Sequence, residues 1–428
     1  MIKEDEYHKR RRKFTQKMKK NSLAVFFSAE PKTRSNDTEY PYRQDSNFYY
    51  LSGFNEDKSA LLFIKREQKT EIFLFVYKKD KTEELWNGKR LGVEAAKKRF
   101  KVDDVFEYKE LTQKIKESIP SLKHLYYDFL LDYSKVKLLK SHAKDIYSFR
   151  NGAKIVEAMR LIKSPVEIAE IKKAISITKE AHHRAIQKAK ECSYEYELQA
   201  EIEYVFRKNG AQSDAYTSIV AAGNNANTLH YIKNDAKIKK DDLILIDAGC
   251  EYNCYASDIT RTIPASGAFT KEQRELYTLV LSVEKEIISM VREGVLRSKL
   301  QKKAQKLLAK GLIELGILKG SVKRVIKKQQ LQKLYPHGIG HWLGIDVHDQ
   351  CPYKDAKGKE IPLSAGMVLT IEPGIYIDKE NKDVPKKYRG IGIRIEDDIL
   401  VTKEGCENLS QEIVKEIDEI EALASSHK

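Results

Sequence analysis

Two short apolar segments in the second half of the chain each end in an acidic residue, and this pattern constrains the fold more than any other. Leu243–Asp247 reads Leu-Ile-Leu-Ile-Asp, and Met367–Glu372 ends in Leu-Thr-Ile-Glu. Apolar runs of this length predict strands buried on both faces, which need helices to cover them. Each terminal acid alone is a weak signal, and Asp247-Ala-Gly is equally consistent with a simple turn. Together the acids carry more weight, because burial disfavours charged carboxylates unless they have a cationic or metal partner. The fold must therefore cover a sheet and bring its acids to a positive charge.

Helix signals surround these strands. Ser164-Pro-Val-Glu167 combines a capping hydroxyl, a proline at the first helical position and a glutamate that reaches back, so it predicts a helix over about Val166–Lys190. A second capping box, Thr270-Lys-Glu-Gln273, opens another helix. The other predicted elements are helices at Glu195–Lys208 and ending near Leu315, and strands at Thr217–Ala222, Asp258–Ile263 and Ile393–Val401. Strands that alternate with helices predict one large α/β domain.

The residues before Ser164 predict a separate, smaller α/β domain. Its expected elements are helices at His8–Lys20 and Val93–Phe100, and strands at Leu23–Ser28, Leu61–Ile64 and Ile72–Tyr77. A chain of 428 residues is long enough for two or three domains. We expect two, over residues 1–163 and 164–428.

The composition argues against a membrane-spanning helix and indicates a reducing compartment. The chain has no run of 18 apolar residues, and its charged N-terminus lacks the apolar core of a signal peptide. Five scattered cysteines cannot all pair with one another, as a secreted disulfide framework would require. We therefore expect a cytoplasmic protein without a membrane partner.

The net charge of +15 has two readings. Clustered cations neutralise the phosphates of nucleic acids or anionic membranes, and His8–Lys13 is the densest basic cluster. Phe14 and Met18, four residues apart, instead indicate an ordinary helix with one packed stripe. Because no zinc-finger, RNA-recognition or helix-turn-helix signature occurs, we expect a solvated basic surface and no nucleic-acid partner.

Three of the ten histidines lie in one block, His337-Gly-Ile-Gly-His341-Trp-Leu-Gly-Ile-Asp-Val-His348-Asp349. A single histidine in a chain of this size is more often a core or surface residue than a ligand. Three imidazoles and two carboxylates among apolar residues and glycines, however, need charged or metal partners. The block therefore indicates a functional site.

Carboxylates supply the other half of the pattern. A hairpin would place Asp247 and Asp258 side by side, Glu372 ends another strand, and Arg394 and Glu396 share one face of a third. Four carboxylates in a dry site raise one another's pKa values, and two divalent cations would cancel their charge. Oxygen-rich ligands with one imidazole favour Mn²⁺ or Co²⁺ over Mg²⁺, Fe²⁺ and Zn²⁺. Two ions about 3.5–4 Å apart can activate a shared water near neutral pH, which is hydrolase chemistry.

These motifs resemble those of the bacterial Xaa-Pro aminopeptidase (aminopeptidase P) family, metallopeptidases of the pita-bread fold. The most specific are Thr228-Leu-His230-Tyr, Asp247-Ala-Gly with Asp258-Ile-Thr-Arg, the block from His337 to Asp349, and Glu372-Pro-Gly-Ile-Tyr376. The resemblance also includes Arg34–Phe48, Leu85–Leu91 and Arg394-Ile-Glu396-Asp397, and so covers nearly the whole chain. It implies an α/β (α+β) fold, with a pita-bread catalytic domain after a smaller, creatinase-like α/β domain.

The resemblance implies a role for each site residue. Asp247 would bind one ion, His341 and Glu372 the other, and Asp258 and Glu396 would bridge both. A hydroxide that bridges the ions would attack the carbonyl of the N-terminal residue, and Glu372 would pass the proton to the leaving nitrogen. His230 and His348 would polarise the scissile carbonyl and hold the tetrahedral intermediate. The implied cofactor is two divalent ions per subunit, predicted as Mn²⁺.

The implied substrates are peptides with proline in the second position. His337, Tyr376 and Arg394 would surround that second residue, although Arg394 has the alternative role of clamping a ligand carboxylate. Trp86 resembles the tryptophan that these enzymes lend to a neighbouring subunit. It therefore implies a homo-oligomer, a dimer or a dimer-of-dimers tetramer.

Other functions stay open on the sequence. A prolidase, which cleaves Xaa-Pro dipeptides, shares the ligand constellation but matches Arg34–Phe48 and Leu85–Leu91 less well. A methionine aminopeptidase would not need the N-terminal domain. A non-catalytic pita-bread module that binds proteins would have lost ligands, whereas this chain keeps all five.

Overall fold

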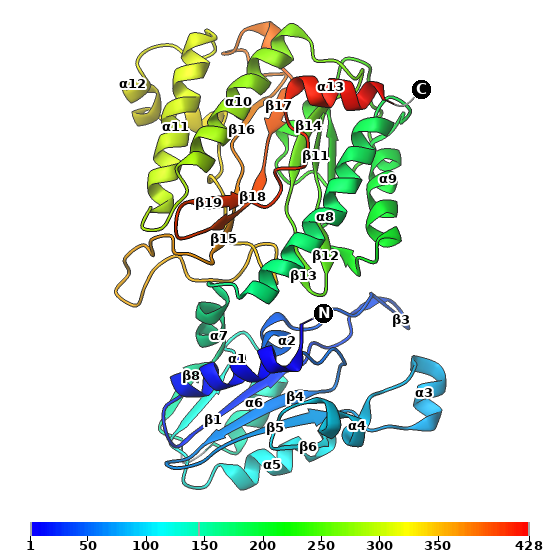
Figure 1. Ribbon diagram of the computed structural model, residues 1–428, viewed down its shortest axis with the longest axis vertical. Helices are drawn as coiled ribbons and strands as arrows, with labels where there is room; N and C mark the ends of the chain where they lie inside the picture. Colours follow the sequence, from blue (N-terminus) through cyan, green and yellow to red (C-terminus); the bar gives the residue numbers. More distant parts are fainter. Residues whose placement is uncertain (1, 144–145, 427–428) are drawn as a thin grey trace. The chain divides into compact units, whose positions relative to one another are not determined.

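The computed structural model describes residues 2–143 and 146–426, and the chain forms two compact units, Met1–Arg160 and Leu161–Lys428 (Figure 1). In each unit, helices cover strands whose apolar residues form the core. No helix in the described part of the chain is both long and apolar enough to cross a bilayer.

The N-terminal unit is built on a mixed six-stranded sheet. Its strands lie in the order β6 (Asp104–Glu107), β5 (Thr70–Val76), β4 (Ala60–Lys65), β1 (Ser22–Phe27), β7 (His124–Tyr127) and β8 (Ser148–Asn151). The predicted apolar strands are β1, β4 and β5, and every residue of β1 is buried. The remaining elements are α1 (Glu4–Lys17), β2 (Thr33–Ser35), β3 (Thr38–Glu39), α2 (Ser46–Ser52), α3 (Lys81–Asn87), α4 (Gly92–Arg99), α5 (Leu111–Ser118), α6 (Tyr133–Ser141) and α7 (Ala153–Arg160).

The basic N-terminal cluster lies in α1, an ordinary packed helix that begins at Glu4 rather than at the predicted His8. Arg10 and Arg11 are buried and donate hydrogen bonds to the carbonyl oxygens of Tyr50 (3.2 Å) and Leu51 (3.0 Å) in the last turn of α2. Carbonyls at a helix end lack intrahelical donors, so the two guanidinium groups satisfy them. Two cations of the cluster therefore serve packing.

In the C-terminal unit, two helix pairs flank the strands. α8 (Pro165–Lys188) packs with α9 (Glu195–Lys208), and α10 (Lys271–Ser289) packs with α11 (Arg297–Glu314). Figure 1 shows strands between the two pairs. The capping boxes predicted at Ser164 and Thr270 are both formed. α12 (Val322–Lys327) follows α11, and α13 (Ile417–Ser425) lies near the C-terminus.

The strands of this unit form several small sheets. One contains β10 (Ile219–Ala222), β11 (Leu243–Asp247) and β14 (Thr260–Pro264), and another contains β15 (Val368–Ile371), β18 (Asp397–Val401) and β19 (Cys406–Asn408). β16 (Gly374–Ile377) pairs with β17 (Ile391–Arg394), and β12 (Cys250–Tyr252) lies between β13 (Tyr255–Ala256) and β9 (Ser213–Asp214). The strands that carry the candidate ligands therefore belong to different sheets.

The prediction of one strand over Ile393–Val401 is wrong. β17 ends at Arg394, β18 begins at Asp397, and the two lie in different sheets. Between them, the amide of Glu396 donates to the carbonyl of Thr260 (3.1 Å), an isolated bridge to β14. The segment is buried throughout although four of its nine residues are charged (Arg394, Glu396, Asp397 and Asp398), so burial does not mark the break.

The predicted hairpin forms with a shifted start. β14 begins at Thr260, directly opposite Asp247, so Asp258 lies two residues before the strand and not on it. β12 and β13 form a smaller hairpin between the two long strands. Gly249 allows the chain to cross here, because a Cβ at this position would lie 1.9 Å from the carbonyl oxygen of Ser257. This contact explains the glycine of the Asp247-Ala-Gly motif.

Candidate metal centre

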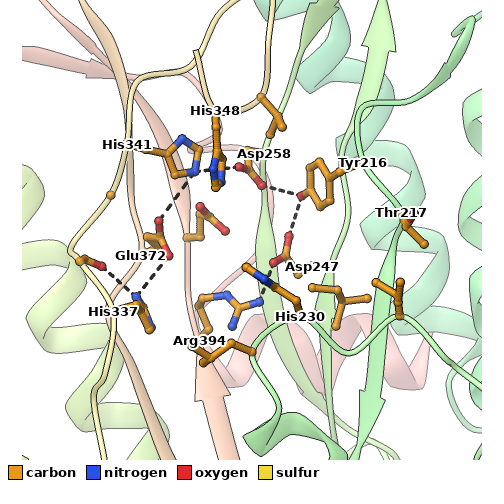
Figure 2. A pocket seen from close by; sticks show the side chains of 17 residues that line it. Tyr216, Thr217, His230, Asp247, Asp258, His337, His341, His348, Glu372 and Arg394 are labelled. Atoms are coloured by element: carbon orange, nitrogen blue, oxygen red, sulfur yellow. Dashed lines mark hydrogen bonds and ion pairs between the residues drawn. The ribbon is translucent and has the colours of Figure 1, made fainter. Parts of the chain in front are cut away.

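A cavity of about 610 Å³ in the C-terminal unit gathers most of the predicted site residues (Figure 2). Its lining includes all five predicted metal ligands, the three predicted substrate-facing histidines and an arginine: Asp247, Asp258, His341, Glu372, Glu396, His230, His337, His348 and Arg394. Residues more than 160 positions apart in the sequence thus meet in one pocket.

Strand ends and loops position the five candidate ligands. Asp247 is the last residue of β11, and Glu372 directly follows β15. Asp258 precedes β14, and Glu396 occupies the connection between β17 and β18. His341 lies in the loop before β15, where its amide and carbonyl bond to Thr370. Strand ends are held by the sheets on one side and open into the cavity on the other.

The candidate ligands form overlapping groups whose donor atoms lie within 4.8 Å of one another: Asp247, Asp258 and Glu396; His341, Glu372 and Glu396; and Asp258, His341 and His348. The first two groups share Glu396. Asp258 also approaches His341, with 3.2 Å between Oδ2 and Nε2. Two neighbouring cation sites that share carboxylates therefore fit this arrangement.

Tyr216 provides an independent test of that fit. Its hydroxyl lies 2.6 Å from Oδ1 of Asp247 and 2.5 Å from Oδ1 of Asp258 (Figure 2). A phenol has one proton, so it can satisfy only one of the two oxygens. The other oxygen needs a proton or a cation, and the same cavity gathers two further carboxylates, those of Glu372 and Glu396. The donor set, rich in oxygen with one imidazole, suits Mn²⁺, Co²⁺ or a similar divalent ion.

Burial and mutual repulsion shift the titration of these groups. Burial raises the pKa of Glu372 to about 7, and burial together with the charge of Asp258 raises the pKa of Glu396 well above its usual range. Burial alone would lower the pKa of His341, but its hydrogen bond to Asp258 and the nearby acids raise it to about 9. The raised carboxyl pKa values show that ionising these groups is costly here, a cost that divalent cations would offset.

The other histidines of the pocket lie on its wall. The rings of His341 and His348 are 3.9 Å apart between centroids, and His230 extends from the loop after β10. Burial, aided by Arg394, lowers the pKa of His337 to about 4, and burial also lowers the pKa of His348. These two imidazoles are therefore neutral at physiological pH and can accept or donate hydrogen bonds.

Arg394 and Tyr376 form a polar wall beside the ligands. Nη2 of Arg394 lies 2.5 Å from Oδ2 of Asp247, and its Nη1 donates to the hydroxyl of Tyr376 (2.9 Å). Tyr376 also contacts Nε2 of His337 (2.8 Å) but does not itself line the cavity. Trp86 lies on α3 of the N-terminal unit, 82% exposed, and is likewise not among the described residues that line the cavity.

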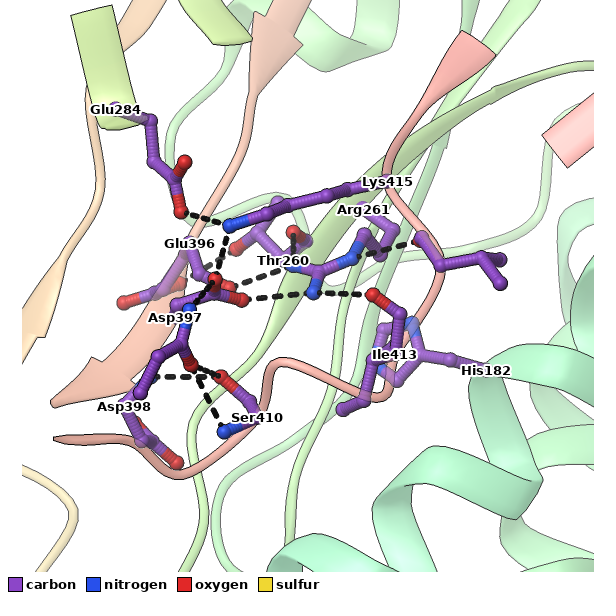
Figure 3. A network of polar contacts seen from close by, with 12 residues as sticks. His182, Thr260, Arg261, Glu284, Glu396, Asp397, Asp398, Ser410, Ile413 and Lys415 are labelled. Atoms are coloured by element: carbon purple, nitrogen blue, oxygen red, sulfur yellow. Dashed lines mark hydrogen bonds and ion pairs between the residues drawn. The ribbon is translucent and has the colours of Figure 1, made fainter. Parts of the chain in front are cut away.

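Sequence reasoning missed several residues of this centre. Tyr216 carries no signal, because it is one of 23 tyrosines and lies outside any motif. Arg261 is part of the Asp258-Ile-Thr-Arg motif, yet its role becomes visible only in the structure (Figure 3). Its guanidinium group directs its five N–H donors to five oxygen atoms, those of the carbonyls of Thr260, Glu396, Ile413 and Val414 and of the carboxylate of Asp397. It thereby fixes the main chain at Glu396.

Comparisons with known proteins agree with this geometry. Residues 169–403 match the model of metallopeptidase family M24, and residues 7–126 match that of the aminopeptidase P N-terminal domain. The chain is 40% identical to the Xaa-Pro aminopeptidase of Escherichia coli over 99% of this chain and 98% of the relative. It is 41% identical to that of Haemophilus influenzae over 98% and 97% of the two chains.

A solved structure agrees over the same length. Aminopeptidase P from Escherichia coli, with the inhibitor Pro-Leu, superposes with a TM-score of 0.95 at 39% identity, covering 99% of this chain and 98% of that one. Together with the two family models, this match confirms the expected fold class, a pita-bread domain that follows a smaller α/β domain.

Proposed function

Because the chain belongs to metallopeptidase family M24, we propose that it is a two-metal exopeptidase that releases the N-terminal residue from peptides with proline in the second position. This is the activity of an Xaa-Pro aminopeptidase, the name carried by relatives that match the chain over nearly its full length. The observation that carries the proposal is the meeting of Asp247, Asp258, His341, Glu372 and Glu396 in one cavity.

The cofactor in this proposal is two divalent ions, taken to be Mn²⁺ because of the oxygen-rich donor set. Asp247 would hold one ion and His341 with Glu372 the other, while Asp258 and Glu396 would serve both. When bound, such ions supply Lewis-acid chemistry, cancelling the carboxylate charge and lowering the pKa of a water molecule.

The chain's own residues then orient the peptide and move protons. Glu372 lines the cavity beside His341, where its carboxylate would carry a proton to the leaving nitrogen. His230 and His348 would donate hydrogen bonds to the scissile carbonyl as it gains negative charge. Arg394 would hold Asp247 in place through their ion pair.

Selection of proline must rest on shape, because a proline in the second position has no amide hydrogen to offer. The neutral ring of His337, supported by Tyr376, and the stem of Arg394 would form the walls around that residue. Trp86, exposed on α3, would complete the site of a neighbouring subunit, so we propose a homodimer or tetramer. We also propose that the protein is cytoplasmic. We place the boundary between its two domains in the sequence just before the Ser164 capping box, which gives domains of residues 1–163 and 164–428.

The test is to remove metal with a chelator, restore Mn²⁺, and measure release of the first residue from tripeptides with proline or alanine second. We expect cleavage of the proline peptide to be strongly preferred and to depend on Mn²⁺. Cleavage of Xaa-Pro dipeptides alone would indicate a prolidase, and equal cleavage of both tripeptides would refute the specificity.

The Asp258→Asn variant tests the ligand assignment in the same assay. The substitution keeps the side-chain shape but removes a charge that belongs to two of the three candidate groups, the one with Asp247 and the one with His341 and His348. We expect a folded protein whose activity falls by at least about a thousandfold, roughly 4 kcal/mol of transition-state stabilisation. Unaltered turnover would contradict the assignment.

A further inference from the structure

We infer that two buried threonine hydroxyls, those of Thr260 and Thr370, are positioning groups that orient the carboxylates of Glu396 and Glu372. The inference rests on the proposed two-ion site. Both threonines are 0% exposed. Thr260 begins β14, and Thr370 lies on β15 two residues before Glu372.

The direction of the Thr260 hydrogen bonds is fixed by chemistry. Its Oγ1 lies 3.1 Å from Nε of Arg394. The same oxygen lies 2.6 Å from Oε2 of Glu396, and Figure 3 shows both of these residues, Thr260 and Glu396. A guanidinium N–H can only donate and an ionised carboxylate can only accept, so with Glu396 ionised, as a metal ligand is, the hydroxyl accepts from Arg394 and gives its single proton to Glu396. The threonine hydroxyl therefore links the Arg394 guanidinium group to one defined carboxylate oxygen of Glu396.

Thr370 repeats this arrangement on the other side of the centre. Its Oγ1 lies 3.1 Å from the backbone amide of His341 and 3.3 Å from Oε1 of Glu372. The amide can only donate, so the hydroxyl proton again points to the glutamate. Thr370 thus connects two ligands proposed for the same ion, His341 through its main chain and Glu372 through its side chain.

Fixed hydrogen bonds of this kind have a consequence for the carboxylates. The terminal torsion of a glutamate is broad, so an unrestrained carboxylate samples many orientations. A donor on one lone pair selects one orientation and leaves the other lone pairs facing the cavity. Gly340 allows the contact between Thr370 and the amide of His341, because a Cβ at residue 340 would lie 1.8 Å from the carbonyl oxygen of Thr370. Hydrogen bonds to ligand carboxylates of this type raise metal affinity by preorganisation.

The residue type supports a role beyond strand formation. Valine has the same branched shape as threonine and is equally suited to a buried strand. Threonine in such a position must bury a hydroxyl, which is unfavourable unless that hydroxyl forms hydrogen bonds. Thr262 provides an internal comparison on the same face of β14. It is also 0% exposed, but its hydroxyl exchanges both hydrogen bonds with the main chain of Arg394 (2.9 and 3.2 Å) and touches no ligand carboxylate.

The experiment compares Thr260→Val, Thr370→Val and the control Thr262→Val, with Thr260→Ser and Thr370→Ser as variants that keep the hydroxyl. Stepwise Mn²⁺ dissociation constants are measured by calorimetry on metal-free protein, and folding is checked by circular dichroism. We expect Thr260→Val to weaken binding of both ions at least about tenfold, because Glu396 would serve both. Thr370→Val should weaken mainly one ion, whereas both serine variants and Thr262→Val should stay within about threefold of the wild type.

Wild-type affinities in both valine variants would overturn the inference, as would an equal loss in Thr262→Val or a failure of serine to preserve binding. If Thr260→Val does not fold, Thr370→Val and the serine variants decide the question. A wild-type chain that binds no ions would instead refute the proposed function, so the two failures are distinguishable.

Discussion

His182 shows how a single buried side chain makes stability depend on pH. It is 1% exposed on α8, its Nε2 donates to the carbonyl of Ala248 (3.0 Å), and its Nδ1 has no hydrogen-bond partner among the described residues. Burial lowers its pKa from 6.5 to about 3. Between these values only the unfolded chain binds the proton, so stability is lost as pH falls below 6.5, by about 1.4 kcal/mol per pH unit.

We therefore predict that His182→Gln makes the pH dependence of stability shallower. Glutamine can keep the N–H donor to Ala248 but does not titrate. Between pH 6.5 and 5.0, the loss in free energy of unfolding should be smaller than in the wild type by about 2 kcal/mol. Urea unfolding of the metal-free proteins at the two pH values measures this difference. The control is His142→Gln at a partly exposed site, and a pH dependence identical in wild type and His182→Gln would contradict the prediction.

Among single residues, the sequence identifies those whose charge would be energetically unfavourable to bury without a partner. Asp247 and Glu372 are recognisable because each ends an apolar strand, and both line the cavity. Thr260 and Thr370 are not recognisable, because a threonine in a strand is an ordinary residue until its hydrogen-bond partners are known. Tyr216 fails for the same reason, since only the fold brings its hydroxyl to two aspartates.

Among the elements, the loop between β10 and β11 depends on one buried carboxylate. The loop carries His230, and Glu195, 0% exposed at the start of α9, contacts the start of the loop and residues on both sides of His230. Oε1 of Glu195 accepts from the amide of Ala222 (2.8 Å) and the side chain of Asn225 (2.9 Å). Oε2 accepts from the hydroxyl of Tyr231 (2.7 Å) and the amide of Ala236 (2.9 Å).

We predict that Glu195→Gln releases this loop without affecting the metal ligands. The new amide group would face donors instead of accepting from them, and each unsatisfied buried donor costs about 1–3 kcal/mol. kcat/KM should fall at least about tenfold, with faster proteolysis of the loop and unchanged Mn²⁺ affinity. Glu197→Gln on the same helix is the matched control, because Glu197 caps α9 and touches no residue of the loop. A loss of metal affinity equal to the loss of activity would contradict the prediction.

Element boundaries were predictable where a side chain marks them. Glu167 accepts from the amide of Ser164, and Thr270 accepts from the amide of Gln273 with its own hydroxyl, so both helices begin within one or two residues of the predicted position. The break at Ile395 and Glu396 has no such marker. It lies where Glu396 forms a single bridge to Thr260 of β14, and a tertiary contact of this kind leaves no trace in the local pattern of apolar residues.

On the scale of the whole molecule, the basic excess is not spread evenly. Residues 297–333 contain twelve Lys and Arg but one acid, Glu314, and so carry +11 of the net +15, leaving +4 for the other 391 residues. The segment includes α11 and α12, which pack together. Lys302, Lys306, Lys323 and Lys327 are all exposed. A surface of one sign, and not the global charge, should therefore govern how the protein responds to polyanions and salt.

This distribution predicts different behaviour for two variants of equal net charge. Replacing Lys302, Lys306, Lys323 and Lys327 with Gln should lower the salt needed for elution from heparin much more than replacing the exposed and dispersed Lys116, Lys137, Lys379 and Lys382. It should also raise stability at low salt by about 1 kcal/mol, because like charges three or four residues apart on a helix repel by about 0.2–0.5 kcal/mol per pair. That gain should vanish in 1 M salt, where the Debye length is about 3 Å. Equal shifts in elution for the two variants would show that the charge acts diffusely, as a solvated surface would.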